Sequence, residues 1–499
     1  MKLDCRRALT MTMALLTTAA VFVSCGETAE NAPVLDSSAG TEAPVTEETE
    51  PVNERLAVKD SLPEGLDYGG KEFHILYTNG MNRKSYVEGA EEENGDIVED
   101  AVINSTRAVE ERLNVDIVHT SNDEGDWSNS GTIIKKLVMA GDTTYDLYMG
   151  EQFGVVQVVP DGVFANGYDI ANLDFTKPWW NNTFMDNLSV GSSARYLLTG
   201  DYNLTVLLQA FVIYYNKSMY ARLYDDANAL YDTVLSGKWT MDRLSEITRE
   251  AFTDLDNNGK TNEGDQLGFL SYKTSSAVDP FMYLADIPYT TRDSSGAYTL
   301  NMQQERAVKL TEKVVDFFWQ EGSCSETETK VETLFSSGSA MFLDGLFSTA
   351  KELRDMKEDF GFLPIPKLDE EQESYRCLVG DCPLLCGVPT TCQNTDMVGA
   401  VLEALNAETY KTVTPVWYET ALKIKYARDD ISSQIIDLIR DSMTTSFIFA
   451  YSPKLSNIGQ IMRELVSTNS KNYMSKAASM EKSANKSLAK LVEAVEENG

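Results

Sequence analysis

The sharpest chemical signal in this chain is a twelve-residue run of oxygen-bearing side chains around a glycine, DLDNNGKTNEGD, residues 254–265. Oxygen donors stand at loop positions 1, 3, 5, 9 and 12, a glycine at position 6 permits a sharp turn, and position 7 offers a backbone carbonyl. This spacing predicts a calcium loop. Its ligands would be Asp254, Asp256, Asn258, Lys260, Asn262 and Asp265.

One feature limits this interpretation of the loop. Asp265 stands where the pattern has a bidentate glutamate, so we expect weakened coordination, with Glu263 able to share the role. The alternative is a polar turn that holds no metal. An ion bound here would be structural.

Catalytic motifs are missing from the sequence. It has no Gly-x-Ser-x-Gly, no His-Glu-x-x-His, no phosphate-binding loop and only 2 histidines. A glycosidase would need two carboxylates across a cleft, and 77 acidic residues always allow such a pair. We therefore predict a protein that is not an enzyme and keep a secreted, glycan-active enzyme as the alternative.

Composition and charge narrow the class further. With 499 residues, 42% hydrophobic and 24% charged, the chain suits a globular protein of two or more domains. The formal net charge of −34 argues against a nucleic-acid partner and against a basic membrane-binding face.

The N-terminus has the pattern of a cleaved export signal: basic residues Lys2, Arg6 and Arg7 precede a largely apolar stretch, residues 8–23. Phe22-Val23-Ser24-Cys25-Gly26 resembles a bacterial lipobox, with phenylalanine where leucine is usual. We expect a signal peptide over residues 1–24 and lipidation of Cys25, which would anchor the protein to the outer face of the cell membrane. An ordinary secretory signal is the alternative. Residues 25–64, acidic and without aromatics after Cys25, predict a flexible tether.

Seven cysteines are present, of which five remain beyond Cys5 and Cys25. Cys382 and Cys386 have a C-x3-C spacing that suggests zinc, but both histidines, His74 and His119, are far away in sequence. Buried free thiols, or one disulfide, explain the cysteines better.

Periodicity predicts an α/β fold. Strands at 73–77, 115–118 and 145–149 alternate with helices at 97–113 and 133–139, which indicates βαβ units. The apolar stretch 197–220 predicts a buried central strand that exits at Asn216-Lys217. Further helices are expected at 241–252 after Thr240 as N-cap, 307–319, 397–407, 431–442 and 474–495, and strands at 340–343 and 360–366.

Five segments resemble, in order, those of the bacterial extracellular solute-binding protein family 1, in its clostridial-type branch: Tyr214–Lys217, Gly237–Thr240, Phe335–Phe342, Leu363–Pro366 and Tyr410–Tyr426. The resemblance implies a two-lobe, periplasmic-binding-protein-like fold of type II. Lobe 1 would comprise residues 65–205 plus 342–385, and lobe 2 residues 206–341 plus 386–499. Hinge crossings would fall at 199–209, 343–345 and 379–387.

The resemblance also implies a function. The protein would capture a sugar or oligosaccharide between the lobes, as a monomer, and deliver it to the permease of an ABC importer. A surface glycan-docking lipoprotein without a closing cleft is a further alternative.

Polar and aromatic residues near the expected hinges and strand ends are the candidate ligand contacts, because sugars stack on aromatic rings and hydrogen-bond to polar groups. For each, core packing or turn formation is the competing explanation. They are Gln152, Trp179, Trp180, Asp201, Tyr202, Asn203, Asp344, Phe347 and Trp417.

Overall fold

The computed structural model describes residues 54–498 apart from 192, 273–274, 295 and 424–429. The export signal, Cys25 and residues 26–53 lie outside this part. No helix within the described ranges has both the length and the apolar character to cross a membrane. Residues 54–64, expected in the tether, instead contact the fold: Arg55 lies over the Tyr410 ring at 4.5 Å, and Leu62 is buried.

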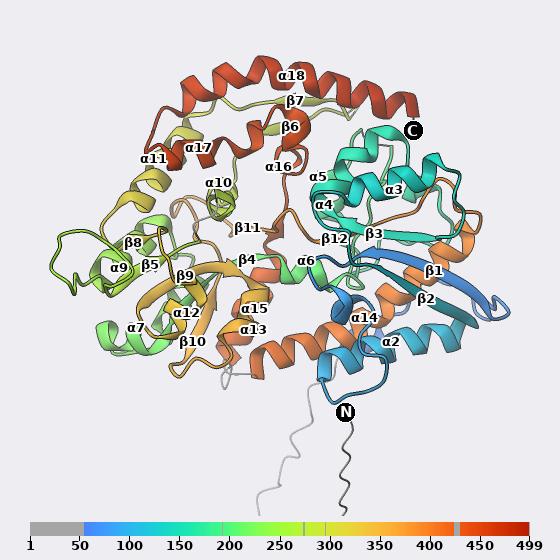
Figure 1. The fold of residues 1–499 in the computed structure, drawn as a ribbon, viewed down its shortest axis with the longest axis horizontal. Coiled ribbons are helices and arrows are strands. Elements are labelled where there is room, and N and C mark those ends of the chain that lie inside the picture. Colours follow the sequence, from blue (N-terminus) through green and yellow to red (C-terminus); the bar gives the residue numbers. More distant parts are fainter. Residues whose placement is uncertain (1–53, 192, 273–274, 295, 424–429, 499) are drawn as a thin grey trace, which may run out of the picture. The chain divides into compact units, whose positions relative to one another are not determined.

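The first sheet has the order β12-β3-β1-β2 (Figure 1). Its parallel strands are β1 (Lys71–Thr78), β2 (Val115–Asn122) and β3 (Leu147–Glu151), and β12 (Leu384–Gly387) runs antiparallel to β3. Helices α2 (Ile97–Leu113) and α3 (Ser130–Met139) connect the parallel strands, which confirms the expected βαβ units. Alternate β1 residues Phe73, Ile75 and Tyr77 pack into one cluster with α2 and α14 (Thr395–Lys423).

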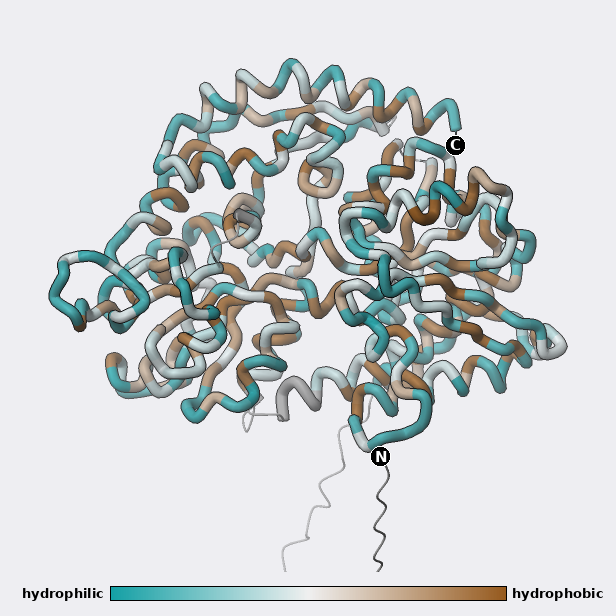
Figure 2. Tube along the Cα trace, in the orientation of Figure 1, coloured by the Kyte–Doolittle hydropathy of each residue, from teal (hydrophilic) through white to brown (hydrophobic). Residues whose placement is uncertain are grey.

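The second sheet has the order β10-β4-β9-β5-β8. Its strands are β4 (Phe211–Asn216), β5 (Leu267–Leu270), β8 (Ser323–Cys324), β9 (Ala340–Leu346) and β10 (Phe360–Leu363). Helices beside this sheet include α7 (Lys217–Tyr224), α8 (Ala229–Leu235), α9 (Met241–Ala251), α11 (Glu305–Trp319), α12 (Val331–Ser336), α13 (Ala350–Leu353) and α15 (Asp430–Asp441). Figure 2 shows hydrophobic residues concentrated in the strands of both sheets.

Strand β4 is the buried centre that the sequence predicts, although it is shorter than expected. Residues 212–215 have no exposed surface, and the Asn216 side chain accepts a hydrogen bond from Met219 N, which starts α7. The earlier part of the apolar stretch is wrong as a strand, because Leu204–Leu208 form the short helix α6. Thr240 caps α9 as predicted, accepting from Arg243 N at 3.4 Å.

Two segments that run between the sheets pair with each other. Ala210, just before β4, forms an antiparallel bridge with Val379, and Gly380 N donates to Gln209 O at 2.8 Å. Both crossings fall in or beside the expected hinge segments. The third expected crossing, 343–345, is wrong, because these residues pair within the second sheet as part of β9.

Helix α14 forms another connection. Its first half packs on α2 in the first lobe, and Trp417 near its end contacts Phe347 beside the second sheet, with ring centroids 5.7 Å apart. This differs from the expected boundary, which assigned everything after residue 385 to lobe 2. The hydrophobic pattern of α14 revealed a helix but not its partner.

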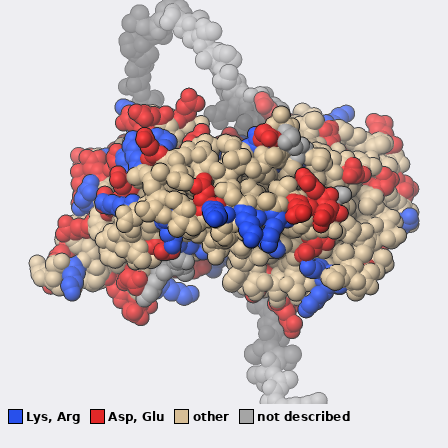
Figure 3. Space-filling view, turned by 90° about the horizontal axis from the view of Figure 1, so that it is seen from above, with Lys and Arg blue, Asp and Glu red and all other residues tan. Residues whose placement is uncertain are grey.

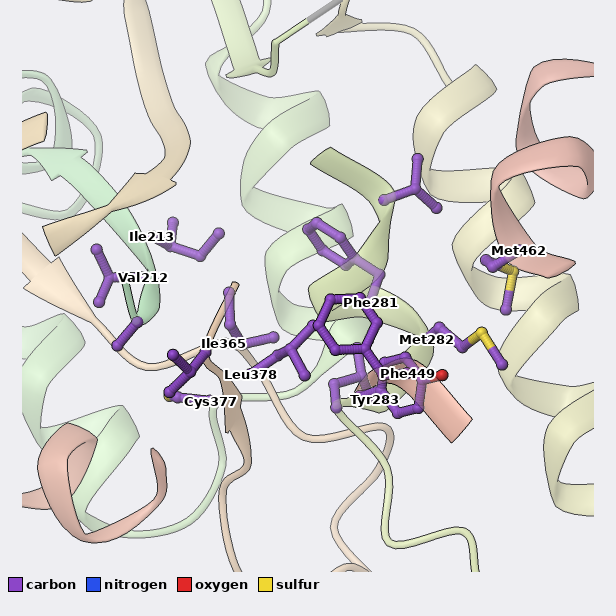
Figure 4. Packing of buried hydrophobic residues seen from close by; sticks show 14 of the residues in the cluster. Val212, Ile213, Phe281, Met282, Tyr283, Ile365, Cys377, Leu378, Phe449 and Met462 are labelled. Carbon is purple, nitrogen blue, oxygen red and sulfur yellow. The ribbon is translucent and has the colours of Figure 1, made fainter. Parts of the chain in front are cut away.

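The C-terminal region contacts elements of both lobes. It contains α16 (Phe447–Ala450), α17 (Ile461–Ser467) and α18 (Tyr473–Asn498), beside α10 (Asp279–Tyr283) and the strand pairs β6–β7 (Thr290–Arg292, Tyr298–Leu300) and β11–β13 (Cys377–Leu378, Met443–Thr444). Figure 4 shows part of the core here, with Val212 of β4, Phe281 of α10, Leu378 of β11 and Phe449 of α16 in one hydrophobic cluster.

Helix α18 spans this region from end to end. Tyr473 Oη donates to Met302 O at 3.0 Å before α11, whereas Asn498 Nδ2 donates to Pro160 O at 3.0 Å in the first lobe. Leu491 and Val495 are buried in one cluster with Val159.

In Figure 3, basic side chains form a short row among acidic groups on the face viewed from above.

Candidate ligand-binding cleft

Buried polar side chains gather where the parallel strands of the first sheet end. Thr78 ends β1, Glu151 ends β3, and Gln152 begins the short helix α4 (Gln152–Val155). None of the three has exposed surface, and Thr78 Oγ1 donates to Glu151 Oε2 at 2.5 Å. Ligands of α/β proteins generally bind beyond the carboxyl ends of such strands.

Arg83 completes this cluster from the loop after β1. It is buried, and its Nη2 donates to Cys382 O at 3.1 Å in the segment that precedes β12. Burial raises the pKa of Glu151, and the positive charge of Arg83 opposes that rise. Burial also lowers the pKa of Arg83.

Several atoms of this cluster lack hydrogen-bond partners within the described protein: Arg83 Nε, Glu151 Oε1, and both side-chain polar atoms of Gln152. Buried polar atoms in proteins nearly always have partners, because an unsatisfied group costs about 1–3 kcal/mol. Donors and acceptors are thus brought together at one sheet edge without protein partners. Unpartnered donors and acceptors are what the hydroxyl groups of a ligand require, although in this structure all of these side chains are buried.

An aromatic side chain lies at the same edge. Trp127, between β2 and α3, is 47% exposed, and its ring meets Phe153 of α4 edge-on at a centroid distance of 5.3 Å. Sequence reasoning missed Trp127, Phe153 and Arg83. The signal that selected Gln152, a position just beyond a predicted strand, could have found its neighbour Phe153, but Arg83 and Trp127 lie farther from the ends of the predicted strands.

At the second sheet, Asp344 lies on β9 and is 1% exposed. Its Oδ2 accepts from Ser271 Oγ at 3.2 Å just beyond β5, and its Oδ1 has no hydrogen-bond partner within the described residues. Burial raises the pKa of Asp344 to about 8. Asp344 is therefore largely protonated at neutral pH, where it can donate as well as accept.

A charged group links this region to the crossing segments. Arg463 of α17 binds Asp279 of α10 through Nε, at 2.7 Å from Oδ1, and through Nη2. Burial raises the pKa of Asp279 to about 6; Arg463 opposes the rise, and the charge of Asp381 adds to it. Asp381 lies in the returning crossing segment, where its carbonyl accepts from Phe153 N at 2.8 Å. The Asp279 side chain of the second lobe thus interacts through its charge with Asp381, in the crossing segment that forms one wall of the first-lobe site.

Four other candidates lie in the core of the first lobe. Trp179, Trp180, Tyr202 and Asn203 are all buried. Trp180 Nε1 donates to Glu403 Oε2 at 3.0 Å, and the Tyr202 hydroxyl meets His119 Nε2 at 3.3 Å. In this structure these side chains are packed inside the first lobe, and their role as ligand contacts stays a prediction.

Two aromatic candidates, Phe347 and Trp417, are also largely buried. Besides contacting each other, Phe347 packs on Phe362 at a centroid distance of 5.4 Å and Trp417 on Tyr418 at 5.5 Å. Both rings join α14 to the second lobe rather than present an open face for stacking.

Asp201 lies at a small cavity beside the hinge. Thr414 Oγ1 donates to Asp201 Oδ2 at 2.9 Å, and Arg55 Nη1 approaches the same oxygen at 3.7 Å. Burial raises the pKa of Asp201 to about 6, with Thr414 and Arg55 opposing the shift. The cavity, about 60 Å³ and also lined by Asn203 and Arg440, is much smaller than ordinary ligand pockets.

The predicted calcium loop brings three carboxylates together. One oxygen from each of Asp254, Asp256 and Asp265 lies within 4.8 Å of the others. Gly259 has a φ of +72°, as the sharp turn at loop position 6 requires, and its N–H donates to Asp254 Oδ2 at 2.9 Å. Converging carboxylates are the donors that calcium prefers, so the residues fit such an ion.

The cysteines do not form a cross-link or metal cluster within the described ranges. Cys324, Cys377, Cys382, Cys386 and Cys392 are all free thiols there. Burial is the main cause that raises the pKa of each of them, which keeps them protonated.

These features define a mixed α/β protein with the two-lobe fold of periplasmic solute-binding proteins. An ABC-transporter solute-binding protein of Thermotoga lettingae, bound with α-D-tagatose, superposes with a TM-score of 0.52 at 14% identity, covering 84% of this chain and 100% of that one. An ABC substrate-binding protein of Listeria monocytogenes, in complex with cycloalternan, gives 0.51 at 11% identity, with coverage of 84% and 99%. No protein-family model and no curated protein matches the chain in sequence. The clostridial-type branch stays a prediction.

Asp344→Asn tests the buried carboxyl. With a pKa of about 8 in the fold against 3.8 ordinarily, the native state holds a proton that the unfolded chain releases, so Asp344 destabilises the fold progressively as pH rises from roughly 4 to 8. We expect the difference in melting temperature, variant minus parent, to increase from pH 4 to 8 and to stay constant above pH 8. The measurement is thermal unfolding from pH 4 to 9.

Asp355→Asn, at a well-exposed aspartate, is the matched control and should show no such trend. A parallel pH dependence of the parent and Asp344→Asn would contradict the raised pKa.

Proposed function

We propose that the protein is the substrate-binding component of an ABC importer, which captures a neutral carbohydrate between its lobes and passes it to a membrane permease. The observation that carries this is the set of unpartnered buried donors and acceptors on Arg83, Glu151 and Gln152 beside the exposed ring of Trp127. Sugars have hydroxyl groups that need such partners and C–H faces that stack on aromatic rings. The two solved structures with this fold, which hold tagatose and cycloalternan, support the proposal.

Capture would proceed by lobe closure. The first-lobe cluster binds sugar hydroxyls, and Asp344 with Ser271 offers polar groups from the second lobe. Because a ligand that contacts both lobes binds the closed form more tightly, it shifts the population toward closure. The paired crossings at Ala210 and Val379 are where the backbone would bend.

The mechanism includes no chemical step on the sugar. Glu151 and Asp344 both have raised pKa values, which a glycosidase would also use for its acid. The glycosidase alternative is therefore tested together with binding, by chromatography of the recovered sugar.

Trp127 provides the first test of capture. In a thermal-shift and calorimetric screen of mono- and oligosaccharides, we expect one sugar class to bind saturably and be recovered intact. Trp127→Ala should weaken that binding about tenfold because it removes a stacking face, a loss of about 1.4 kcal/mol. Trp127→Phe, which keeps a ring, is the matched control and should retain most of the affinity.

Sugar breakdown in this screen would replace the proposal by a glycan-active enzyme. Binding that Trp127→Ala leaves unchanged would remove the assigned site, and binding of amino acids or peptides alone would indicate a different solute.

We also propose that the loop at residues 254–265 holds a structural calcium ion. The convergence of three carboxylates at a glycine turn supports this. Calcium should raise the melting temperature of the parent, and Asp254→Ala should abolish the rise because it removes the first ligand.

Asp355→Asn is the control, since it removes an aspartate outside the loop. A parent whose melting temperature does not respond to calcium would contradict a calcium site.

The remaining proposal concerns Cys25, which lies outside the described residues. The lipobox-like sequence supports lipidation of Cys25 and anchoring at the outer face of the cell membrane. The protein would act as a monomer. Cys25→Ser should move the protein from the membrane fraction to the soluble fraction, whereas Cys5→Ser should not. Retention of Cys25→Ser in membranes would refute lipid anchoring.

A further inference from the structure

A second, larger cavity lies on the second lobe. It has a volume of about 760 Å³, within the range of ordinary ligand pockets. Its walls are the loop Gly259–Thr261, the end of α11, the segment 320–326 and helix α17. We call it the flank cavity. None of the described lining residues belongs to the first sheet or its helices, so its walls do not depend on lobe closure.

Trp319 provides an aromatic wall. It is 56% exposed. Trp127 of the cleft is the other exposed tryptophan among the described residues, and the remaining tryptophans are buried. Trp319 Nε1 donates to Val466 O at 2.7 Å, which fixes the ring against α17. An indole held this way presents its apolar surface to the cavity at little cost in side-chain freedom.

Polar groups around the ring are fixed as well. Gln320 Oε1 accepts from Ser245 Oγ at 2.6 Å and from Arg249 Nη1 at 2.9 Å. Tyr272 Oη donates to Glu332 Oε1 at 2.5 Å. Ser323 Oγ, which also lines the cavity, is buried and has no hydrogen-bond partner within the described residues. The cavity therefore combines an open ring with positioned polar atoms.

The charges around the cavity disfavour an anionic ligand. Glu321 and Glu326 are exposed acids on its wall, and the basic residues among its described lining are Lys260 and Arg463, of which Arg463 already binds Asp279. With a net charge of −34 on the whole chain, a phosphate or carboxylate ligand would meet repulsion. A flat aromatic surface beside neutral and acidic hydrogen-bonding groups suits an uncharged polyhydroxylated ring.

The cavity wall is tied to its surroundings by hydrogen bonds from backbone N–H groups to side-chain oxygens. Gly322 N donates to Thr261 Oγ1 at 3.1 Å, and Glu263 Oε2 accepts from Glu328 N at 3.0 Å and Thr329 N at 2.9 Å. These contacts join the segment that carries Ser323 to the loop that forms the facing wall. The cavity is preorganised, which reduces the entropy that a ligand must remove.

We propose that the flank cavity is a second carbohydrate-binding site, which takes a neutral glycan segment on Trp319 in both the open and closed states of the lobes. Such a site would hold a longer glycan at the protein while the cleft exchanges its own ligand. The inference does not require the cleft to bind sugar, since the two sites share no residue.

Calorimetric titration of the chain from residue 26 onward with maltotriose, cellotriose, xylotriose and mannotriose tests the proposal. We expect a trisaccharide to bind with an affinity that Trp319→Ala lowers at least tenfold and Trp319→Phe largely keeps. Ser325→Arg, which places a long side chain in the cavity and leaves Trp319 itself unchanged, should also abolish this binding. Trp127→Ala should leave it unchanged.

The outcomes separate the two sites. Binding that is lost in Trp127→Ala but unchanged in Trp319→Ala and Ser325→Arg would overturn the flank site and leave the cleft proposal standing. Binding lost only in Trp319→Ala and Ser325→Arg would support the flank site and leave the cleft proposal to its own screen with Trp127→Ala. Absence of binding by the parent to every trisaccharide would overturn the flank cavity as a carbohydrate site.

Discussion

The arrangement of both lobes depends on a short stretch of backbone pairing where the chain crosses between the sheets. Ala210 and Val379 are fully buried and bridge each other, while Ala210 O also accepts from Phe347 N at 3.0 Å and Val379 N donates to Thr444 O at 2.8 Å. Four segments distant in sequence therefore meet through main-chain groups. Because these bonds do not depend on side-chain identity, they set the direction of both sheets whatever ligand the cleft accepts.

Buried carboxyl groups have different roles on the two sides of this junction. Glu403 has a pKa raised to about 7 by burial, but its Oε2 accepts from Trp180 Nε1 and Asp174 N, which explains its place in the core. Glu151 and Asp344 are equally buried and, like Glu403, each keeps one unpartnered oxygen, but they lie at or near strand ends whereas Glu403 lies within α14. Position at the sheet edge, rather than burial, separates candidate ligand contacts from core residues.

Much of the fold could be predicted from the sequence, because local chemistry fixes it. Alternation along β1, the cap at Asn216 and the cap at Thr240 each act within a few residues. The partner of α14 and the split of residues 197–220 into α6 and β4 depend on contacts between distant segments, which periodicity does not encode. The candidate site was harder still. Trp179 and Trp127 look alike in sequence, and it is contacts with distant segments, such as Trp179 with Tyr410 of α14, that bury one ring and not the other.

Helix α18 places a geometric condition on any motion of the lobes. Its 26 residues form a rod of about 39 Å, attached near Tyr473 to the second lobe and at Asn498 to the first. A stiff link of fixed length between two hinged bodies permits them to swivel but opposes simple separation of its attachment points. Lobe closure in this protein would therefore proceed at a nearly constant distance between the two ends of the connecting helix, which limits how wide the entrance to the cleft can open.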